Sequence, residues 1–248
     1  MTSSKPVIGI VCCHKIVDNQ PSQNVYEKYT NAIHHYGGTP ILLPHVIVEE
    51  DSFEPVMSML DGILLTGSYS NVAPARYKAT HKELKQDLTR DELSFKLLDY
   101  AKNKQLPLLA ICRGLQEMNV YFGGTLHPDW REVGCYFEQH LEDSNAPLEV
   151  QYQPIHDVII NGGGHLSSFN NKWKVNSLHK QCINKVGEDL FVEATAPDTL
   201  IEAISLPKHP FLLGVQWHPE ADYAKDEMSK YLFSGLIKHA KQARSIKG

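Results

Sequence analysis

The chain has 248 residues, of which 42% are hydrophobic and 21% charged, a composition typical of a globular protein with a substantial core. Its 24 basic and 29 acidic residues give a net charge of −5, so no basic surface predicts binding to nucleic acid or to an anionic membrane. The apolar run after Lys5 is not followed by a small-residue cleavage site, and no run approaches the roughly 18 apolar residues of a membrane span. The five cysteines are scattered without CxxC spacing, which argues against a disulfide framework and favours a reducing cytoplasm.

The first half of the chain alternates short apolar runs with stretches of helical periodicity. We predict strands within residues 5–13, 39–44, 61–67 and 106–111, and helices within 22–38, 53–62, 89–104 and 113–124. The third of these helices has Thr89 and Glu92 in capping-box spacing. Strands separated by helices form right-handed βαβ units, so we expect a parallel sheet with helices on both faces.

Beyond residue 147 the pattern changes to strands joined by short turns, which predicts a partly antiparallel region. These strands are predicted within residues 147–160, 189–196, 199–206 and 211–217, and a final helix within 223–248. No internal repeat, low-complexity tract or linker divides the chain. The expected fold class is therefore α/β, a three-layer α/β/α domain over residues 1–248 with a mostly parallel central sheet.

Cys112 lies where the fourth predicted strand passes into its helix. The carboxyl ends of parallel strands border the ligand crevice, and a helix N-terminus offers free N–H groups and a partial positive charge. Such a place stabilises a thiolate and supplies a donor to an oxyanion. Ala110 and Gly114 are small enough for a sharp turn, as in a nucleophile elbow. The alternative is a buried structural cysteine, which is the common fate of this residue type.

A thiol nucleophile needs a base, and the base needs a group that orients it. His218 and Glu220 follow an apolar strand, and side chains two positions apart in an extended chain point to the same side. The alternative is a histidine and a glutamate at a surface strand end. The cysteine turn in the same chain favours the reading as a Cys–His–Glu triad.

The segments ICRGLQ and GVQWHPE resemble the class I glutamine amidotransferase-like superfamily. The stretches LDGILLTG, TRDELSFKLL, YFGGTLHPD and VNSLHKQ resemble its γ-glutamyl hydrolase branch, peptidase C26, and GSYSNVAPARY and QYQPIHDV resemble the γ-glutamyl-γ-aminobutyrate hydrolases within that branch. The resemblance implies a flavodoxin-like fold and hydrolysis of a γ-glutamyl amide through a cysteine thioester. For the narrower group the substrate is γ-glutamyl-γ-aminobutyrate, in putrescine catabolism, and no metal or organic cofactor is implied.

The resemblance also assigns roles to particular residues. It implies that Cys112 attacks the γ-carbonyl, that His218 is first base and then acid, and that Glu220 orients the imidazole. Oxyanion donors are expected in the backbone N–H groups of Gly67 and Arg113. Contacts with the glutamyl portion of the substrate are expected from the helix residue Gln116 and from main-chain groups of one loop: Asn176, Ser177, Leu178 and His179. By position alone, Asn71 and Tyr77 are placed near the leaving amine.

Two further features could suggest a site of another kind. Five histidines show no metal-ligand spacing, so we expect them at the surface or in hydrogen-bonded core positions and predict no metal site: His127, His140, His156, His165 and His179. The glycine-rich stretch 162–165 lacks the Lys-Ser or Lys-Thr of a phosphate loop, so it is predicted to be a turn.

Other functions stay open at this point. A glutaminase subunit would supply ammonia to a separate synthetase chain. A hydrolase of γ-glutamyl peptides or folate polyglutamate would differ only in the leaving group, and a binding module would keep the fold without turnover. The expected partner is a small γ-glutamyl amide, with no nucleic acid and no membrane, and a homo-oligomer stays open.

Overall fold

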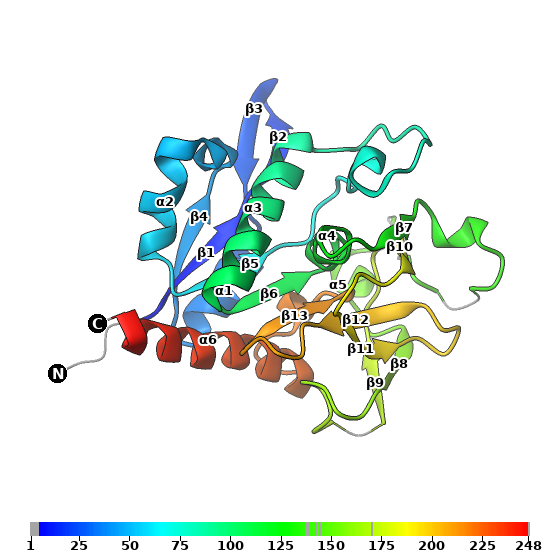
Figure 1. Cartoon of the computed structure of the whole chain (residues 1–248). Coiled ribbons are helices and arrows are strands. Elements are labelled where there is room, and N and C mark those ends of the chain that lie inside the picture. The colour runs from blue at the N-terminus through cyan, green and yellow to red at the C-terminus, as the bar shows by residue number, and fades with distance from the viewer. Residues whose placement is uncertain (1–4, 137–138, 142, 144, 170, 248) are drawn as a thin grey trace.

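A nine-stranded sheet runs through the centre of the chain, and one part of it is parallel (Figure 1). The computed structural model describes residues 5–136, 139–141, 143, 145–169 and 171–247. The parallel strands lie in the order β4-β1-β5-β6-β13. In that order their bounds are Thr39–Leu43, Val7–Val11, Gly62–Leu65, Leu108–Ile111 and Leu212–Val215. This half of the sheet confirms the parallel arrangement that the sequence predicts.

The sheet continues from β13 with four antiparallel strands, in the order β12-β11-β8-β9. Their bounds are Ile201–Ser205, Phe191–Thr195, His156–Ile160 and Lys172–Val175. Two small sheets pair β2 with β3 and β7 with β10: Cys13–Val17, Gln20–Asn24, Thr125–His127 and Cys182–Lys185. The sequence pattern does not predict β2 and β3, because these strands are mostly exposed and carry no apolar face.

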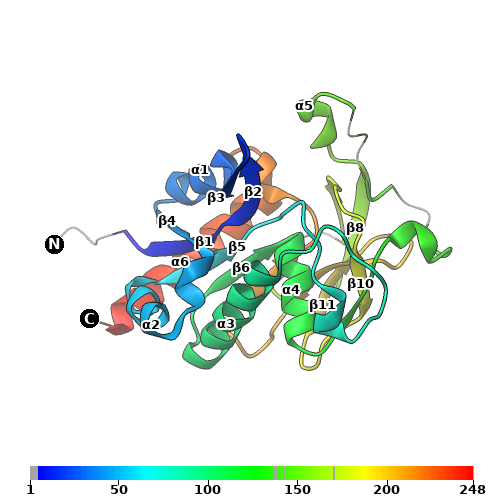
Figure 2. The same cartoon turned by 90° about the horizontal axis from the view of Figure 1, so that it is seen from above.

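Helices cover both faces of the parallel strands. On one face lie α1 (Glu27–His35) and α6 (Glu227–Lys247), and on the other α2 (Glu50–Met59), α3 (Leu88–Lys104) and α4 (Arg113–Tyr121). Figure 2 shows α2, α3 and α4 together on one side of β1, β5 and β6, with α1 on the other. No helix among the described residues is long and apolar enough to cross a membrane.

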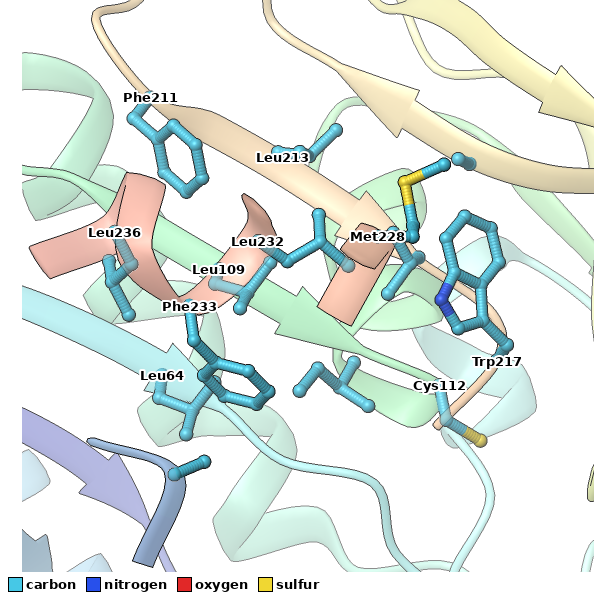
Figure 3. Close-up of a cluster of buried hydrophobic side chains, with 14 of the residues drawn as sticks. Leu64, Leu109, Cys112, Phe211, Leu213, Trp217, Met228, Leu232, Phe233 and Leu236 are labelled. Atoms are coloured by element: carbon cyan, nitrogen blue, oxygen red, sulfur yellow. The ribbon is translucent and has the colours of Figure 1, made fainter. Parts of the chain in front are cut away.

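Alternation along β6 divides the core into two clusters. Leu109 and Ile111 pack with α1 and α6, whereas Leu108 and Ala110 pack with α3 and α4. Because successive side chains of a strand point to opposite faces, a strand buried on both faces is apolar at every position. Figure 3 shows the first cluster, in which Leu109 of β6 lies against side chains of α6. The four residues of β6 are completely buried, so the end of this strand is rigidly placed.

Two local predictions are wrong. The capping box at Thr89 does not form, because α3 begins earlier, with Asp87 as its N-cap accepting the N–H of Arg90 at 3.1 Å. Residues 148–151 form the short helix α5 (Leu148–Gln151) instead of the start of a strand. Leu148 and Val150 remain 69% and 55% exposed, so their alternation has no sheet to pack against.

Candidate active site

Cys112 occupies the turn between β6 and α4 in a backbone conformation that L-residues rarely adopt. Its φ is +52° and its ψ is −102°, and its N–H donates to the carbonyl of Val215 at 2.8 Å. Figure 3 shows its side chain beyond the end of the strand, with the sulfur pointing away from the labelled apolar side chains. Backbone strain of this kind persists only where the surrounding structure holds it, and it gathers at functional sites. The predicted sharp turn is therefore present.

Gly114 allows α4 to start this close to the sheet. A Cβ at this position would lie 2.7 Å from the carbonyl oxygen of Leu65 in β5. Any side chain here would push α4 away from the sheet, and Cys112 with it. The close approach of the α4 and β5 backbones therefore requires glycine at position 114.

His218 and Glu220 follow β13, the strand next to β6, and form a buried pair. The Nδ1 of His218 lies 2.7 Å from Oε1 of Glu220, which is in the short 3₁₀ turn Pro219–Ala221. Burial alone would lower the pKa of His218, but Glu220 and Cys112 next to the ring raise it to about 10. Burial disfavours the Glu220 carboxylate, yet His218 holds the pKa of Glu220 below its ordinary value. The imidazole thus lies next to Cys112 and is hydrogen-bonded through Nδ1 to Glu220 at 2.7 Å.

Asn176 fixes the main chain of His218. Its side-chain Oδ1 accepts the His218 N–H at 2.7 Å, and its Nδ2 donates to the His218 carbonyl at 3.0 Å. Asn176 follows β9, so this pair of hydrogen bonds joins the antiparallel edge of the sheet to the triad. The structure brings Asn176 to the site through its side chain, whereas the resemblance implies contacts by its main chain.

Gly67, after β5, lies against the histidine. A Cβ at Gly67 would be 2.7 Å from Cε1 of His218, so only glycine leaves room for the ring. Its N–H donates to the hydroxyl of Tyr29 at 3.0 Å. Tyr29 also lies beside Glu220, and burial followed by Glu220 raises the pKa of this phenol well above its ordinary value. The place of Tyr29 beside the triad is visible only in the structure.

Arg113 is the first residue of α4, where helical N–H groups have no carbonyl partner within the helix. Its side chain is buried and joins two carboxylates, bonding Glu117 and lying 2.7 Å from Oδ1 of Asp91. Glu117 also pairs with Arg90 at 3.1 Å. This ion network lies beneath the elbow. The i,i+4 spacing of Arg113 and Glu117 on α4 indicates one of its pairs, whereas no sequence spacing indicates the pairs with Asp91 and Arg90.

Gln116 lies one turn into α4 and is almost completely buried. Its Nε2 donates to the carbonyl of Gln181 at 2.7 Å and to Oε1 of Gln216 at 3.1 Å. The side chain of Gln181 in turn bonds both main-chain groups of Val72 and the hydroxyl of Tyr77. Gln181, which the sequence pattern does not indicate, thus connects α4 to the loop after β5.

Two of the other residues predicted to contact the substrate have side chains that bond groups outside the triad. The Asn71 Nδ2 donates to Glu83 at 2.7 Å, so its side chain closes its own loop. Ser177 Oγ donates to the carbonyl of His140 at 3.0 Å, and Leu178 is half-buried. Within the part of the chain that the structure describes, their side chains form no hydrogen bond with Cys112. The roles of Asn71, Ser177 and Leu178 toward a substrate stay predictions.

The structure also shows where the histidines and the glycine-rich stretch 162–165 lie. Three of the five histidines, His140, His156 and His179, meet around Glu202 in the interior. The sequence spacing does not predict this convergence, because the four residues come from separate strands and loops. The stretch 162–165 forms a turn, as predicted, in which the N–H of His165 donates to Glu193 at 2.7 Å.

A lysine and a tyrosine that the sequence does not identify lie beside the triad. The Nζ of Lys28 in α1 is 3.9 Å from Oε1 of Glu220 and 3.3 Å from the centre of the Tyr152 ring. Tyr152 meets the His218 ring edge to face, with 5.7 Å between ring centres. Lys28 is the cation that the described contacts place closest to the His218–Glu220 pair.

Comparison with known proteins agrees with this architecture. The sequence profile of peptidase C26 matches residues 6–220. The chain is 45% identical over 238 residues to gamma-glutamyl-gamma-aminobutyrate hydrolase of Escherichia coli K12, covering 94% of this chain and 93% of that protein. It is 34% identical over 281 residues to a Rickettsia prowazekii (strain Madrid E) protein provisionally named glutamine amidotransferase-like, covering 96% and 98%.

A solved structure supports the fold independently. A Thermoplasma acidophilum protein, provisionally named as a GMP synthase subunit, matches with a TM-score of 0.65 at 16% identity, over 98% of this chain and 97% of that one. The expected three-layer α/β fold is confirmed. With the family profile and close relatives spanning nearly its whole length, the chain belongs to the peptidase C26 family of cysteine hydrolases.

Proposed function

We propose that this protein hydrolyses γ-glutamyl amides, with γ-glutamyl-γ-aminobutyrate as the substrate and Cys112 as the nucleophile. The observation that carries the proposal is the strained Cys112 beside a histidine whose other nitrogen lies 2.7 Å from a buried carboxylate. Two Escherichia coli relatives at 45% identity carry the name of this activity. The cytoplasm is the proposed compartment, since all five cysteines are free thiols.

In this mechanism the Cys112 thiolate adds to the γ-carbonyl carbon, and the electron pair of the C=O bond moves onto oxygen. The C–N bond then breaks, and Nε2 of His218 gives its proton to the departing amine. A γ-glutamyl thioester remains on Cys112. Water then loses a proton to His218 and adds to the thioester carbonyl, the C–S bond breaks, and glutamate leaves. The raised pKa of His218 suits it to the first proton transfer.

Two backbone N–H groups are proposed to stabilise the oxyanion. Arg113 supplies one at the N-terminus of α4, where the helix leaves its first N–H groups without partners. Gly67 supplies the other, and its present acceptor, the Tyr29 hydroxyl, is replaced by the substrate oxygen. Gln116 and Gln181 hold the surrounding loops in place for the glutamyl portion.

Lys28 is proposed to recognise the leaving amine. γ-Aminobutyrate carries a carboxylate that ammonia, the leaving group of glutamine, lacks. A cation next to the triad therefore favours the first substrate over the second. Lys28 lies close to the His218–Glu220 pair and over the Tyr152 ring, which fits this role.

The proposal is tested by assaying the purified chain, without any partner, on equal concentrations of γ-glutamyl-γ-aminobutyrate, glutamine, γ-glutamyl peptides and folate polyglutamate. We expect the highest kcat/KM on γ-glutamyl-γ-aminobutyrate, with release of glutamate and γ-aminobutyrate. A preference for glutamine that increases when a synthetase is added would contradict the proposal and favour the glutaminase function. No turnover of any γ-glutamyl amide by folded protein would favour a binding module.

A further inference from the structure

Three histidines and a glutamate form a closed cluster in the antiparallel part of the molecule. This histidine cluster consists of His140, His156, His179 and Glu202. His156 begins β8, Glu202 lies in β12, and the other two lie in loops. All four side chains are at most 2% exposed. The triad mechanism uses none of them.

The outer nitrogen of each ring is held by a hydrogen-bond acceptor. The three pairs are His140 Nε2 to Asp198 Oδ2 at 2.9 Å, His156 Nδ1 to the Asp157 carbonyl at 3.0 Å, and His179 Nδ1 to the Gln181 carbonyl at 3.1 Å. Since each partner is an acceptor, the ring proton lies on the outer nitrogen. The inner nitrogen of each neutral ring is then a lone pair.

These three inner nitrogens face one carboxylate oxygen. Oε1 of Glu202 lies 3.2 Å from His140 Nδ1, 3.6 Å from His156 Nε2 and 3.7 Å from His179 Nε2. Among the described residues, none of the three nitrogens, and neither oxygen of Glu202, has a hydrogen-bond partner. With all three rings neutral, lone pairs thus meet lone pairs in the interior. A proton on one ring would satisfy one of the three contacts and leave the others, and buried polar atoms are rarely left in this state.

The distances between these nitrogen and oxygen atoms fit the ligands of a metal ion. Nitrogen and oxygen ligands about 2.1 Å from a tetrahedral zinc ion are about 3.4 Å from one another. The three distances around Glu202 lie close to that edge length, and the ligand atoms of His140, His179 and Glu202 are all within 4.8 Å of one another. His156 lies outside this group of three and approaches its Glu202 oxygen at 3.6 Å. Histidines that bind a metal also donate their other N–H to a carboxylate or a backbone carbonyl, as all three do here.

We propose that the histidine cluster is a structural zinc site, with His140 Nδ1, His156 Nε2, His179 Nε2 and one oxygen of Glu202 as ligands. Four protein ligands complete a tetrahedron and leave no position for a substrate, which makes the site structural. The carboxylates of Glu202 and Asp198 balance the two positive charges of the ion. Three imidazoles and a carboxylate form a donor set that suits zinc better than calcium or magnesium, which prefer oxygen ligands.

The site stabilises the loop that reaches the triad. His179 lies in the segment 176–181, whose ends are Asn176 and Gln181. Asn176 holds the main chain of His218, and the Gln181 carbonyl accepts from Gln116. An ion bound to His179 therefore holds in place the loop whose two ends contact His218 and Gln116. It does so without contacting the reacting atoms.

The experiment uses the full chain, purified without a polyhistidine tag, and measures metal content together with thermal unfolding. We expect about one zinc ion per chain, a lower Tm after a chelator, and recovery with Zn²⁺ but not with Mg²⁺. H156A and E202Q are expected to lose the zinc, whereas H34A, which removes an exposed histidine of α1, keeps it. Because the variants could unfold, wild-type protein is also loaded with Co²⁺, which should show the intense visible absorption of a four-coordinate ion.

Three results would overturn the proposal. The first is wild-type protein that stays free of metal after incubation with Zn²⁺ and has the same Tm with and without chelator. The second is bound zinc that folded H156A and E202Q retain in full. The third is a weak Co²⁺ spectrum typical of six-coordinate ions, which would place the metal outside the cluster.

Discussion

The side-chain amide of Asn176 holds the main chain of His218 in both directions, accepting its N–H at 2.7 Å and donating to its carbonyl at 3.0 Å. The amide carries its acceptor, Oδ1, and its donor, Nδ2, on two separate atoms, whereas a carboxylate has no donor. Asn176 therefore sets the position of His218 before the ring meets Glu220 and Cys112. It is a positioning residue for the proposed reaction.

Replacing Asn176 by alanine should lower kcat and leave KM nearly unchanged. Loss of both hydrogen bonds lets His218 move, and we expect a decrease in kcat of about 10- to 100-fold, or about 1.4–2.8 kcal/mol. Steady-state kinetics on γ-glutamyl-γ-aminobutyrate measure both constants. A raised KM with unchanged kcat would instead show that Asn176 contacts the substrate, as the family resemblance implies for its main chain.

Gly67→Ala should inactivate the protein without unfolding it. The new Cβ would lie 2.7 Å from Cε1 of His218, so the ring must leave its place between Cys112 and Glu220. We expect kcat to decrease by about 10²-fold or more. Gly162→Ala is the matched control, since a Cβ there meets nothing within 4 Å. Full activity in Gly67→Ala, with a circular dichroism spectrum like wild type, would refute the close approach.

The His218–Glu220 pair makes the free energy of unfolding depend on pH. The folded-state pKa of Glu220 is below its ordinary 4.5, so its contribution is complete above pH 4.5 and is lost as the pH falls through the lower value. The pKa of His218 is raised from 6.5 to about 10, so its contribution is complete below pH 6.5 and is lost as the pH rises toward 10. The pair therefore stabilises most between these two limits.

Glu220→Gln tests this pH dependence. We expect the variant to be less stable than wild type by about 3 kcal/mol near pH 5.5, because the buried imidazolium loses its partner. The difference should shrink as the pH rises through about 10, because His218 then loses its proton in the wild type. Denaturant unfolding at a series of pH values gives the difference directly. A constant difference from pH 5.5 to 10 would mean that His218 does not titrate with a raised pKa.

Lys28→Met should change the choice of leaving group. The variant keeps a long apolar side chain and removes the ammonium that lies over Tyr152 and near Glu220. We expect kcat/KM on γ-glutamyl-γ-aminobutyrate to decrease by about 10-fold and that on glutamine to decrease much less. Equal losses on both substrates would show that Lys28 acts on the triad itself.

The sequence predicts the parts of the site that depend on local chain geometry. Cys112 and Gly114 lie on one turn, and His218 and Glu220 lie two residues apart, so the strand-to-helix pattern already gives their relative directions. The parallel half of the sheet follows from the same alternation, because its strands are buried on both faces and read as continuous apolar runs.

The rest depends on contacts between distant segments. Tyr29 meets Gly67 across 38 residues, and Gln116 meets Gln181 across 65. Neither pair has a spacing that a single sequence could reveal. The histidine cluster is hidden for the same reason, since Glu202 lies in a strand that reads as ordinary core and its partners lie in three other segments. The convergence of these residues is a property of the folded sheet.

The central claim is that Cys112 forms a covalent γ-glutamyl intermediate. Rapid acid quenching of the protein during turnover of γ-glutamyl-γ-aminobutyrate, followed by mass spectrometry of the intact chain, measures it most directly. We predict one γ-glutamyl group per chain, located on the peptide that contains Cys112, absent from Cys112→Ala, and a decrease in turnover of about 10⁴-fold or more in that variant. Unchanged turnover in folded Cys112→Ala, or an adduct on another of the five cysteines, would contradict the claim.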